Sequence, residues 1–219
     1  IEGAFQMEPF MVHSSSSTVK VMLAWANATH GQAFVVIGTL TMNPGDMEDV
    51  SMSFCDTVNF GDHVSEVALA GLLDGKVVVF YTRRESALGQ PTILSSRVVS
   101  GTSTSVELGA EENAELAHWS SAQRTVRTLR ATGLSSNRAV VAYHVFVRAS
   151  VAAEHGVSMF ALSGVQLNSE NLPEFHAPVL ITQHSTTFNL DERELVGGIV
   201  ALDSEDVAVL YDSAGLSPR

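Results

Sequence analysis

Cysteine is nearly absent from this chain of 219 residues, since Cys55 is the only one. A single cysteine cannot form a disulfide within the chain, and its place in an apolar segment predicts a buried, unreactive thiol. Long hydrophobic runs are missing too. No apolar run approaches the roughly 20 residues that a helix needs to cross a bilayer, so no transmembrane segment is predicted.

Charged residues are scarce, and the basic ones most of all. They make up 16% of the chain, against about 25% in a typical soluble protein. The chain has 12 Lys and Arg residues and 24 Asp and Glu residues, which gives a formal net charge of −12. Nucleic-acid binding needs a basic surface that replaces counterions, so this class is excluded. A low charged fraction with 45% hydrophobic residues suits stacked β-sheets.

Motifs that carry chemistry are missing as well. The eight histidines form no HExxH or other dense metal-ligand spacing, and no Gly-x-Ser-x-Gly elbow occurs. Arg83-Arg84-Glu85 is the nearest approach to a sialidase-type arginine cluster, and a solvated loop is the favoured interpretation. The sequence therefore predicts no catalytic, cofactor-binding or metal-binding residue, no cofactor, and a protein that is not an enzyme.

What is present is a repeated segment of six residues. Each copy begins with a charged residue and ends with an aromatic one, and the residues between them are all apolar. The copies are Lys20–Trp25, Lys76–Tyr81, Arg138–Tyr143 and Asp206–Tyr211. Short continuous apolar runs rich in Val and Ala are typical of strands buried on both faces. We call these four copies the b segments.

The flanks of the b segments repeat too. A leucine stands four residues before the charged residue in the last three copies, and a turn of Asp, Ser, Gly or Asn residues lies between. In the first copy Ser14 to Ser17 stand where the leucine would be, and Pro9 to His13 are a weak candidate for the preceding strand. A third strand is predicted at 31–37, 89–94 and 156–162, and a fourth at 50–55, 114–119 and 177–182. The prediction is an all-β chain of antiparallel four-stranded repeats, a β-propeller or partial propeller.

The repeat divides the chain into units of about sixty residues within a single repeat domain, 1–219. The predicted blades are about 1–62, 63–123 and 124–189, and 190–219 supplies a partial blade. Propellers close with about four to eight blades. Three explanations fit this count: a piece of a longer propeller, completion by a partner, or an open, capped array. We favour the first.

Several of these residues resemble a tandem repeat common in large predicted proteins of algae, dinoflagellates especially. The closest match runs from Val98-Val-Ser-Gly-Thr102 through Arg130-Ala-Thr-Gly-Leu134 to Arg138-Ala-Val-Val-Ala-Tyr143, and Tyr211-Asp212 extends the last copy. The chain departs from the pattern where Cys precedes the aromatic. The resemblance implies an algal source but no activity. It favours an extracytoplasmic compartment or an organelle lumen, such as the thylakoid lumen.

The charges predict two unlike faces. The third-to-fourth strand connections carry most of the acids, and the opposite connections carry Arg83, Arg84, Arg124 and Arg148. A docking surface for a basic partner would have this pattern, and so would a face that only aids solubility. The predicted partner-binding residues are Asp46, Glu48, Asp49, Glu107, Glu111 and Glu112.

The functional prediction is a non-enzymatic, propeller-like binding or scaffold protein. We expect other protein subunits as partners, and a soluble accessory role in a larger assembly, such as one peripheral to a photosynthetic membrane complex. A lectin-like carbohydrate binder is the alternative. It requires exposed aromatics, and Trp25, Trp119 and Tyr143 all fall in predicted strands. A propeller hydrolase is a third option and requires a carboxylate pair at a central pocket.

Overall fold

The structure is a computed structural model, and it confirms the all-β prediction. It describes residues 5–10, 18–27, 31–43, 46–84, 92–102, 104–114, 124–148, 155–187 and 195–212. All regular structure in these ranges is β-strand. Among these residues, accordingly, there is no helix that could span a membrane.

The strands form three larger sheets and a hairpin, each antiparallel and each built from consecutive strands. Sheet 1 holds β1 (Phe5–Phe10), β2 (Thr18–Ala26), β3 (Ala33–Asn43), β4 (Asp46–Phe54) and β5 (Val58–Gly61). Sheet 2 holds β6 (Val64–Gly71), β7 (Val77–Arg84), β8 (Thr92–Gly101), β9 (Val106–Leu108) and β10 (Glu112–Asn113). Sheet 3 holds β11 (Arg124–Gly133), β12 (Arg138–Arg148), β13 (His155–Leu167), β14 (Pro173–Phe175) and β15 (Val179–Thr187). Hairpin 4 holds β16 (Leu195–Ala201) and β17 (Val207–Asp212).

The fourth position of every larger sheet is filled by two strands in succession. Both pair with the third strand, one along each half: β4 and β5 with β3, β9 and β10 with β8, and β14 and β15 with β13. At each interruption a backbone N–H still donates to the third strand. These hydrogen bonds run from Cys55 to Ile37, from Gly109 to Val98 and from His176 to Gly164. Each acceptor is paired with the third residue of a b segment, namely Met22, Val78 and Val140.

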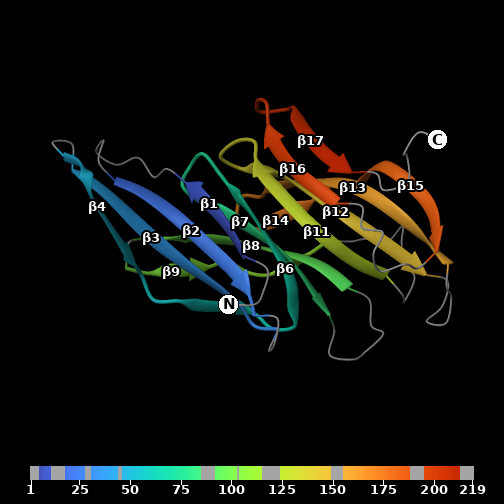
Figure 1. The fold of residues 1–219 in the computed structure, drawn as a ribbon, viewed down its shortest axis with the longest axis horizontal. Helices are drawn as coiled ribbons and strands as arrows, with labels where there is room; N and C mark the ends of the chain where they lie inside the picture. Colours follow the sequence, from blue (N-terminus) through green and yellow to red (C-terminus); the bar gives the residue numbers. More distant parts are fainter. Residues whose placement is uncertain are drawn as a thin grey trace.

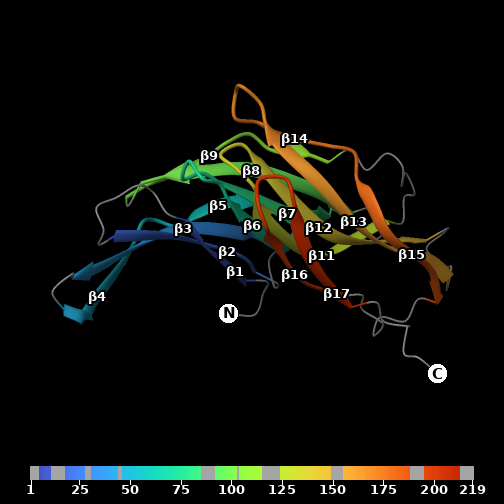
Figure 2. The same cartoon turned by 90° about the horizontal axis from the view of Figure 1, so that it is seen from above.

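The sheets lie face to face in chain order along the long axis of the molecule (Figure 1, and from above in Figure 2). Their first strands meet, β1 against β6, β6 against β11 and β11 against β16. The approach is so close that a Cβ on Gly133 would stand 1.9 Å from the carbonyl oxygen of Gly71. Only glycine fits there. The described sheets do not close into a barrel or a propeller.

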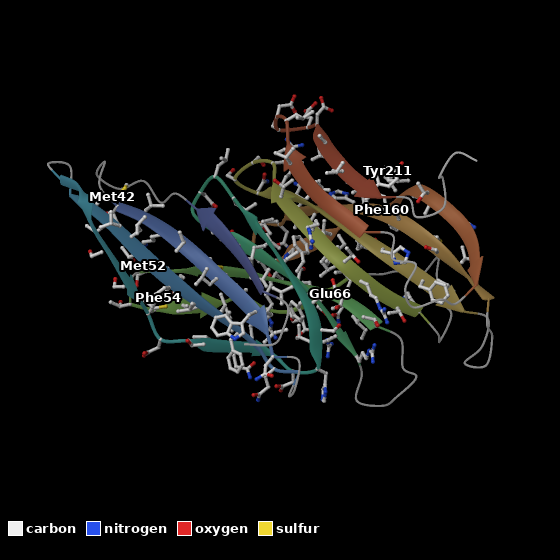
Figure 3. The ribbon with its side chains drawn as sticks, in the orientation of Figure 1. Met42, Met52, Phe54, Glu66, Phe160 and Tyr211 are labelled. Atoms are coloured by element: carbon white, nitrogen blue, oxygen red, sulfur yellow. The ribbon has the colours of Figure 1, made fainter. Side chains whose placement is uncertain are left out.

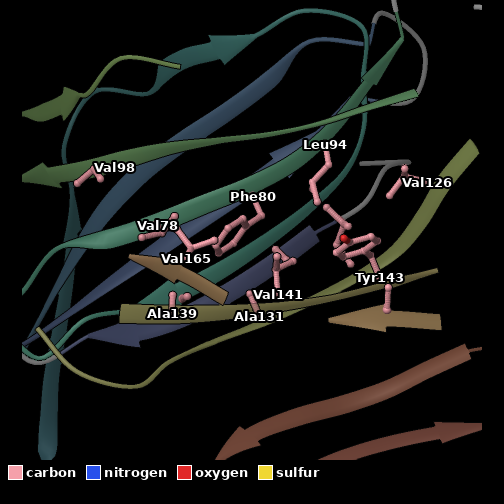
Figure 4. Close-up of a cluster of buried hydrophobic side chains, with 14 of the residues drawn as sticks. Val78, Phe80, Leu94, Val98, Val126, Ala131, Ala139, Val141, Tyr143 and Val165 are labelled. Atoms are coloured by element: carbon pink, nitrogen blue, oxygen red, sulfur yellow. The ribbon is translucent and has the colours of Figure 1, made fainter. Parts of the chain in front are cut away.

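Alternate residues of the b segments in β7 and β12 face opposite neighbours, and these contacts make most of the core. Met22 and Ala24 of β2 belong to the same buried cluster as Val77, Val79 and Tyr81 of β7. The other face of β7 contributes to the cluster between sheets 2 and 3 (Figure 4). Its members on the two central strands are Val78, Phe80, Ala139, Val141 and Tyr143. Each large buried side chain contributes about 1.5–3 kcal/mol, which explains why both faces are apolar.

An irregularity in β11 ties sheet 3 to sheet 2. The pairing of β11 with β12 shifts between Arg127 and Arg130, and Thr128 has a φ of 57°. The shift takes the N–H of the fully buried Leu129 out of the ladder, and this N–H donates to Oε2 of Glu66 at 3.0 Å. Glu66 lies on β6, so one carboxylate satisfies a buried donor of the next sheet.

Replacing Glu66 tests this contact. Glu66→Ala leaves the Leu129 N–H buried without an acceptor and should lower the free energy of unfolding by about 1–3 kcal/mol. Glu66→Gln retains a side-chain oxygen and should lose less than half as much. Urea unfolding measures both values. Equal losses of stability in the two variants would show that this hydrogen bond does not stabilise the contact between sheets 2 and 3.

Tyr81 and Tyr143 are the last residues of two b segments, and both are buried in the core. Burial raises the pKa of Tyr81 to about 12, against a hydrogen bond from Arg97 that lowers it. Burial also raises the pKa of Tyr143 to about 12, and its hydroxyl lies 2.8 Å from the hydroxyl of Ser163. Both phenols are therefore neutral in the folded chain at pH values where an exposed tyrosine ionises.

The raised pKa values predict alkaline destabilisation. Between pH 10 and pH 12 the unfolded chain releases these two protons and the folded chain retains them, so stability falls as the pH rises. The loss should reach about 1.4 kcal/mol per pH unit for each tyrosine. The variant Y81F/Y143F should have a flatter profile in urea titrations across this range. A wild-type slope in that variant would exclude these tyrosines as the cause.

Candidate functional site

Sheet 1 packs against sheet 2 with one face only. Met22, Ala24 and Ala26 of β2 point to sheet 2, so the residues between them point the other way. We call this second face the end face. Its members are Val19, Val21, Leu23 and Trp25 of β2, Phe34, Val36, Gly38, Leu40 and Met42 of β3, and Val50, Met52 and Phe54 of β4. These side chains are apolar apart from the indole N–H of Trp25, and the polar Asn59 of β5 pairs with Phe34 beside them.

The alternation in β4 is the reverse of what an outermost sheet needs. Ser51 and Ser53 lie on the side of sheet 2, since they pair with Thr41 and Thr39. The outward side carries Val50, Met52 and Phe54, which are 49%, 45% and 52% exposed. An antiparallel sheet with one solvated face normally turns its polar residues to water. In β4 the serines are exposed on one side, and the outward side leaves an exposed apolar surface.

The end face is continuous from β4 towards β2. A Cβ on Gly38 would lie 2.8 Å from Cε of Met52, 3.0 Å from Cε1 of Phe54 and 3.0 Å from Cγ2 of Val21. Three strands thus bring side chains together over one glycine. Trp25 and Phe34 stack with their ring centroids 5.7 Å apart and extend the surface along β2 and β3. Figure 3 shows Met42, Met52 and Phe54 at the opposite end of the molecule from Tyr211.

Hairpin 4 presents a smaller apolar surface at that opposite end. Tyr211 stacks on Phe160 of sheet 3 with ring centroids 5.2 Å apart. The other face of the hairpin leaves Val200, Leu202 and Leu210 at 56%, 68% and 71% exposure. This surface spans two strands.

The predicted acidic residues lie in three different settings. Asp46, Glu48 and Asp49 fall within strand β4 rather than in a connection. Glu107 is exposed on β9, and Glu112 is half-buried on β10. Docking to a basic partner through these residues stays a prediction.

Glu111 departs from the expected separation of charges. Its Oε1 lies 2.9 Å from Nε of Arg83, and its Oε2 accepts a hydrogen bond from Arg97 at 3.1 Å. Arg83 was expected in a connection on the opposite face, but it lies in strand β7. The strand position corrects that expectation, because β7 places Arg83 beside Glu111 on the same sheet.

The Arg83–Arg97–Glu111 cluster has a structural role. Arg97 also donates from Nε to the hydroxyl of Tyr81 at 3.2 Å and from NH1 to the carbonyl oxygen of Gly109 at 3.0 Å. It thereby fixes the interruption between β9 and β10. The one carboxylate is neutralised by two guanidinium groups. Across the described ranges, no group of three or more His, Cys, Asp and Glu is placed to hold a metal.

Sequence reasoning did not single out the end face, although a signal was present. Val50-Ser-Met-Ser-Phe54 alternates strictly between apolar and polar residues, and Lys20–Trp25 is apolar on both faces. The sequence alone could not assign the apolar side of Val50–Phe54 to the outside, because that depends on how β3 pairs with β2 and β4.

Comparison with protein-family models, curated proteins and solved structures gives no match. The resemblance to algal tandem repeats therefore stays a prediction.

The different settings of the acids give a measurable contrast. Glu111→Gln removes the charge that holds Arg83 and Arg97 and should lower the free energy of unfolding by about 1–3 kcal/mol. Glu107→Gln changes an exposed side chain and should remain within about 0.5 kcal/mol of wild type. Urea unfolding at neutral pH gives both values. If Glu111→Gln left the free energy of unfolding unchanged, the cluster would not have the structural role assigned to it.

Proposed function

We propose that this chain is a non-enzymatic assembly module, a propeller-like stack of repeated sheets whose end face binds another protein. The outward apolar side of β4 is the observation that carries the proposal. Contiguous exposed apolar surface of this kind marks interaction sites in soluble proteins.

The energy available at the end face supports binding. Met42, Val50, Met52 and Phe54 are between 37% and 52% exposed. Covering such half-exposed side chains contributes about 0.5–1.5 kcal/mol each, half the value of full burial. The central residues Val21 and Val36 are already buried within sheet 1, at 9% and 6% exposure, so the surface is preformed. A preformed surface loses little conformational entropy when it binds.

The chemistry of the end face favours a protein over a carbohydrate. Sugar sites combine an aromatic platform with polar groups that bind hydroxyls. Phe54 lies beside Met52 and Val21 over Gly38, and the exposed side chains Met42, Val50, Met52 and Phe54 are all apolar. The polar Asn59 pairs with Phe34 at the other end of β3. A lectin-like function therefore has less support than an apolar protein contact.

The wider setting of the assembly rests on the algal resemblance and the charge. A chain of net charge −12 suits a basic partner surface, which would contact the acidic residues of the chain and not the end face. Together they support an accessory subunit peripheral to a membrane complex, such as a photosynthetic one, in an extracytoplasmic or lumenal compartment.

The end face can be tested by placing a charge in it. Met52→Glu should reduce the affinity for the native partner at least about 100-fold, because burying an unpaired carboxylate in an apolar contact is costly. The readout is the size of the native particle that contains the chain, purified gently from cells that express each variant.

Leu73→Glu is the matched control, since Leu73 is 77% exposed in the turn after β6 and lies on no stacking face. It should leave the particle unchanged. A particle of wild-type size with Met52→Glu would contradict the proposal.

A further inference from the structure

We propose that the occupant of the end face is the end face of a second copy of this chain, which gives a two-fold symmetric dimer of sheet 1 on sheet 1. This inference rests on the proposed function, because it names the partner of the same surface.

The end face is wider than hairpin 4, and this difference favours a second sheet 1 over hairpin 4 as its partner. Sheet 1 presents four strands side by side, β1 to β4. Hairpin 4, which also exposes apolar side chains, has two strands. A single strand of sheet 3, β15, exposes Val179, Leu180 and Ile181. A head-to-tail contact with hairpin 4 would leave half of the end face uncovered. A second sheet 1 has the same width, so it covers the whole surface.

The composition of the end face permits contact with itself. In a two-fold interface the same patch lies on both sides, so any charge near the axis would meet its own copy. The described end-face side chains on β2, β3 and β4 carry no charge, and the acidic residues of β4, Asp46 to Asp49, precede the first of them, Val50. Asn59 of β5, which pairs with Phe34, is neutral. The described side chains would therefore bring no like charges together.

The area is sufficient for a stable dimer. Neighbouring strands lie about 4.8 Å apart and rise about 3.3 Å per residue, so four strands of about nine residues cover roughly 19 by 30 Å. Two such surfaces in contact remove more than roughly 1,000 Å² from water, the size at which specific interfaces begin.

The contact continues a mode of packing that the chain already uses. Sheet 1 on sheet 2 and sheet 2 on sheet 3 both join through apolar faces built from alternate residues of central strands. Twisted antiparallel sheets pack face to face at about −30° whichever apolar faces are involved. A second copy would add one more joint of this type at the end of the stack.

The test is the sedimentation equilibrium of the full chain across micromolar concentrations. The wild type should sediment as a dimer of 2 × 23.4 = 46.8 kDa. Met52→Glu should raise the dimer dissociation constant about 100-fold or more and give a monomer. Met42→Lys, at the edge of the same surface, should act in the same direction. Circular dichroism verifies that each variant retains its strands.

Two controls locate the contact. Leu73→Glu, in an exposed turn, and Leu210→Glu, on hairpin 4, should both remain dimeric. If Met52→Glu and Leu210→Glu are each monomeric and a mixture of the two dimerises, the contact is head-to-tail and the two-fold dimer is overturned. If Met52→Glu is as dimeric as the wild type, the dimer does not use the end face and the inference is overturned.

A monomeric wild type overturns the inference and leaves two cases, which an apolar dye such as ANS separates. Dye binding that Met52→Glu abolishes shows an open end face, and the proposed function then stands with a different protein as partner. A monomer that binds no dye shows that the end face is covered within one chain, and the proposed function falls as well.

Discussion

Stacking of sheets through strands that are apolar on both faces is the constraint on which the rest of this structure depends. The second strands of sheets 2 and 3, β7 and β12, send alternate residues into two different cores. In β7, Val77, Val79 and Tyr81 face sheet 1, and Val78 and Phe80 face sheet 3. Such a strand is stable only between two neighbours, because either face alone would expose a row of large apolar side chains. The order of the sheets along the chain follows from this requirement.

At the ends of the stack this requirement is not met, because one face of the last sheet has no neighbouring sheet among the described residues. Sheet 1 has the residue pattern of an internal sheet. Trp25 ends its b segment as Tyr81 ends that of sheet 2, and Tyr81 packs into the core between two sheets. The outward face of sheet 1 nevertheless leaves Met42, Val50, Met52 and Phe54 between 37% and 52% exposed in the single chain. Polar contacts such as Glu66 to Leu129 stabilise the packing of one sheet on the next. The exposed side chains of the end face are apolar, and in the proposed function another apolar surface covers them.

The strands that the sequence predicted well are those whose signal is local. Lys76–Tyr81 lies almost entirely within β7, since a continuous apolar run between turn residues is enough to identify it. The first strand was placed at Pro9 to His13, but β1 spans Phe5–Phe10, because its position is set by pairing with β2. Fourth strands were predicted at 50–55 and 177–182, which overlap β4 and β15, and at 114–119, which lies almost wholly outside the described residues. The interruption of the fourth position into two strands was not predicted. The two strands are fixed by hydrogen bonds to the third strand and by Arg97, which no local pattern reveals.

The central claim is that Met42 and Met52 are covered by another protein surface when the chain is in its native state. Oxidation by dilute peroxide, measured by mass spectrometry on the native particle and on the same chain unfolded in urea, tests it directly because exposed thioethers react fastest. The account predicts that both methionines oxidise many times more slowly in the native particle than in the unfolded chain. Oxidation at nearly equal rates would show that the end face is open to water and would contradict the account.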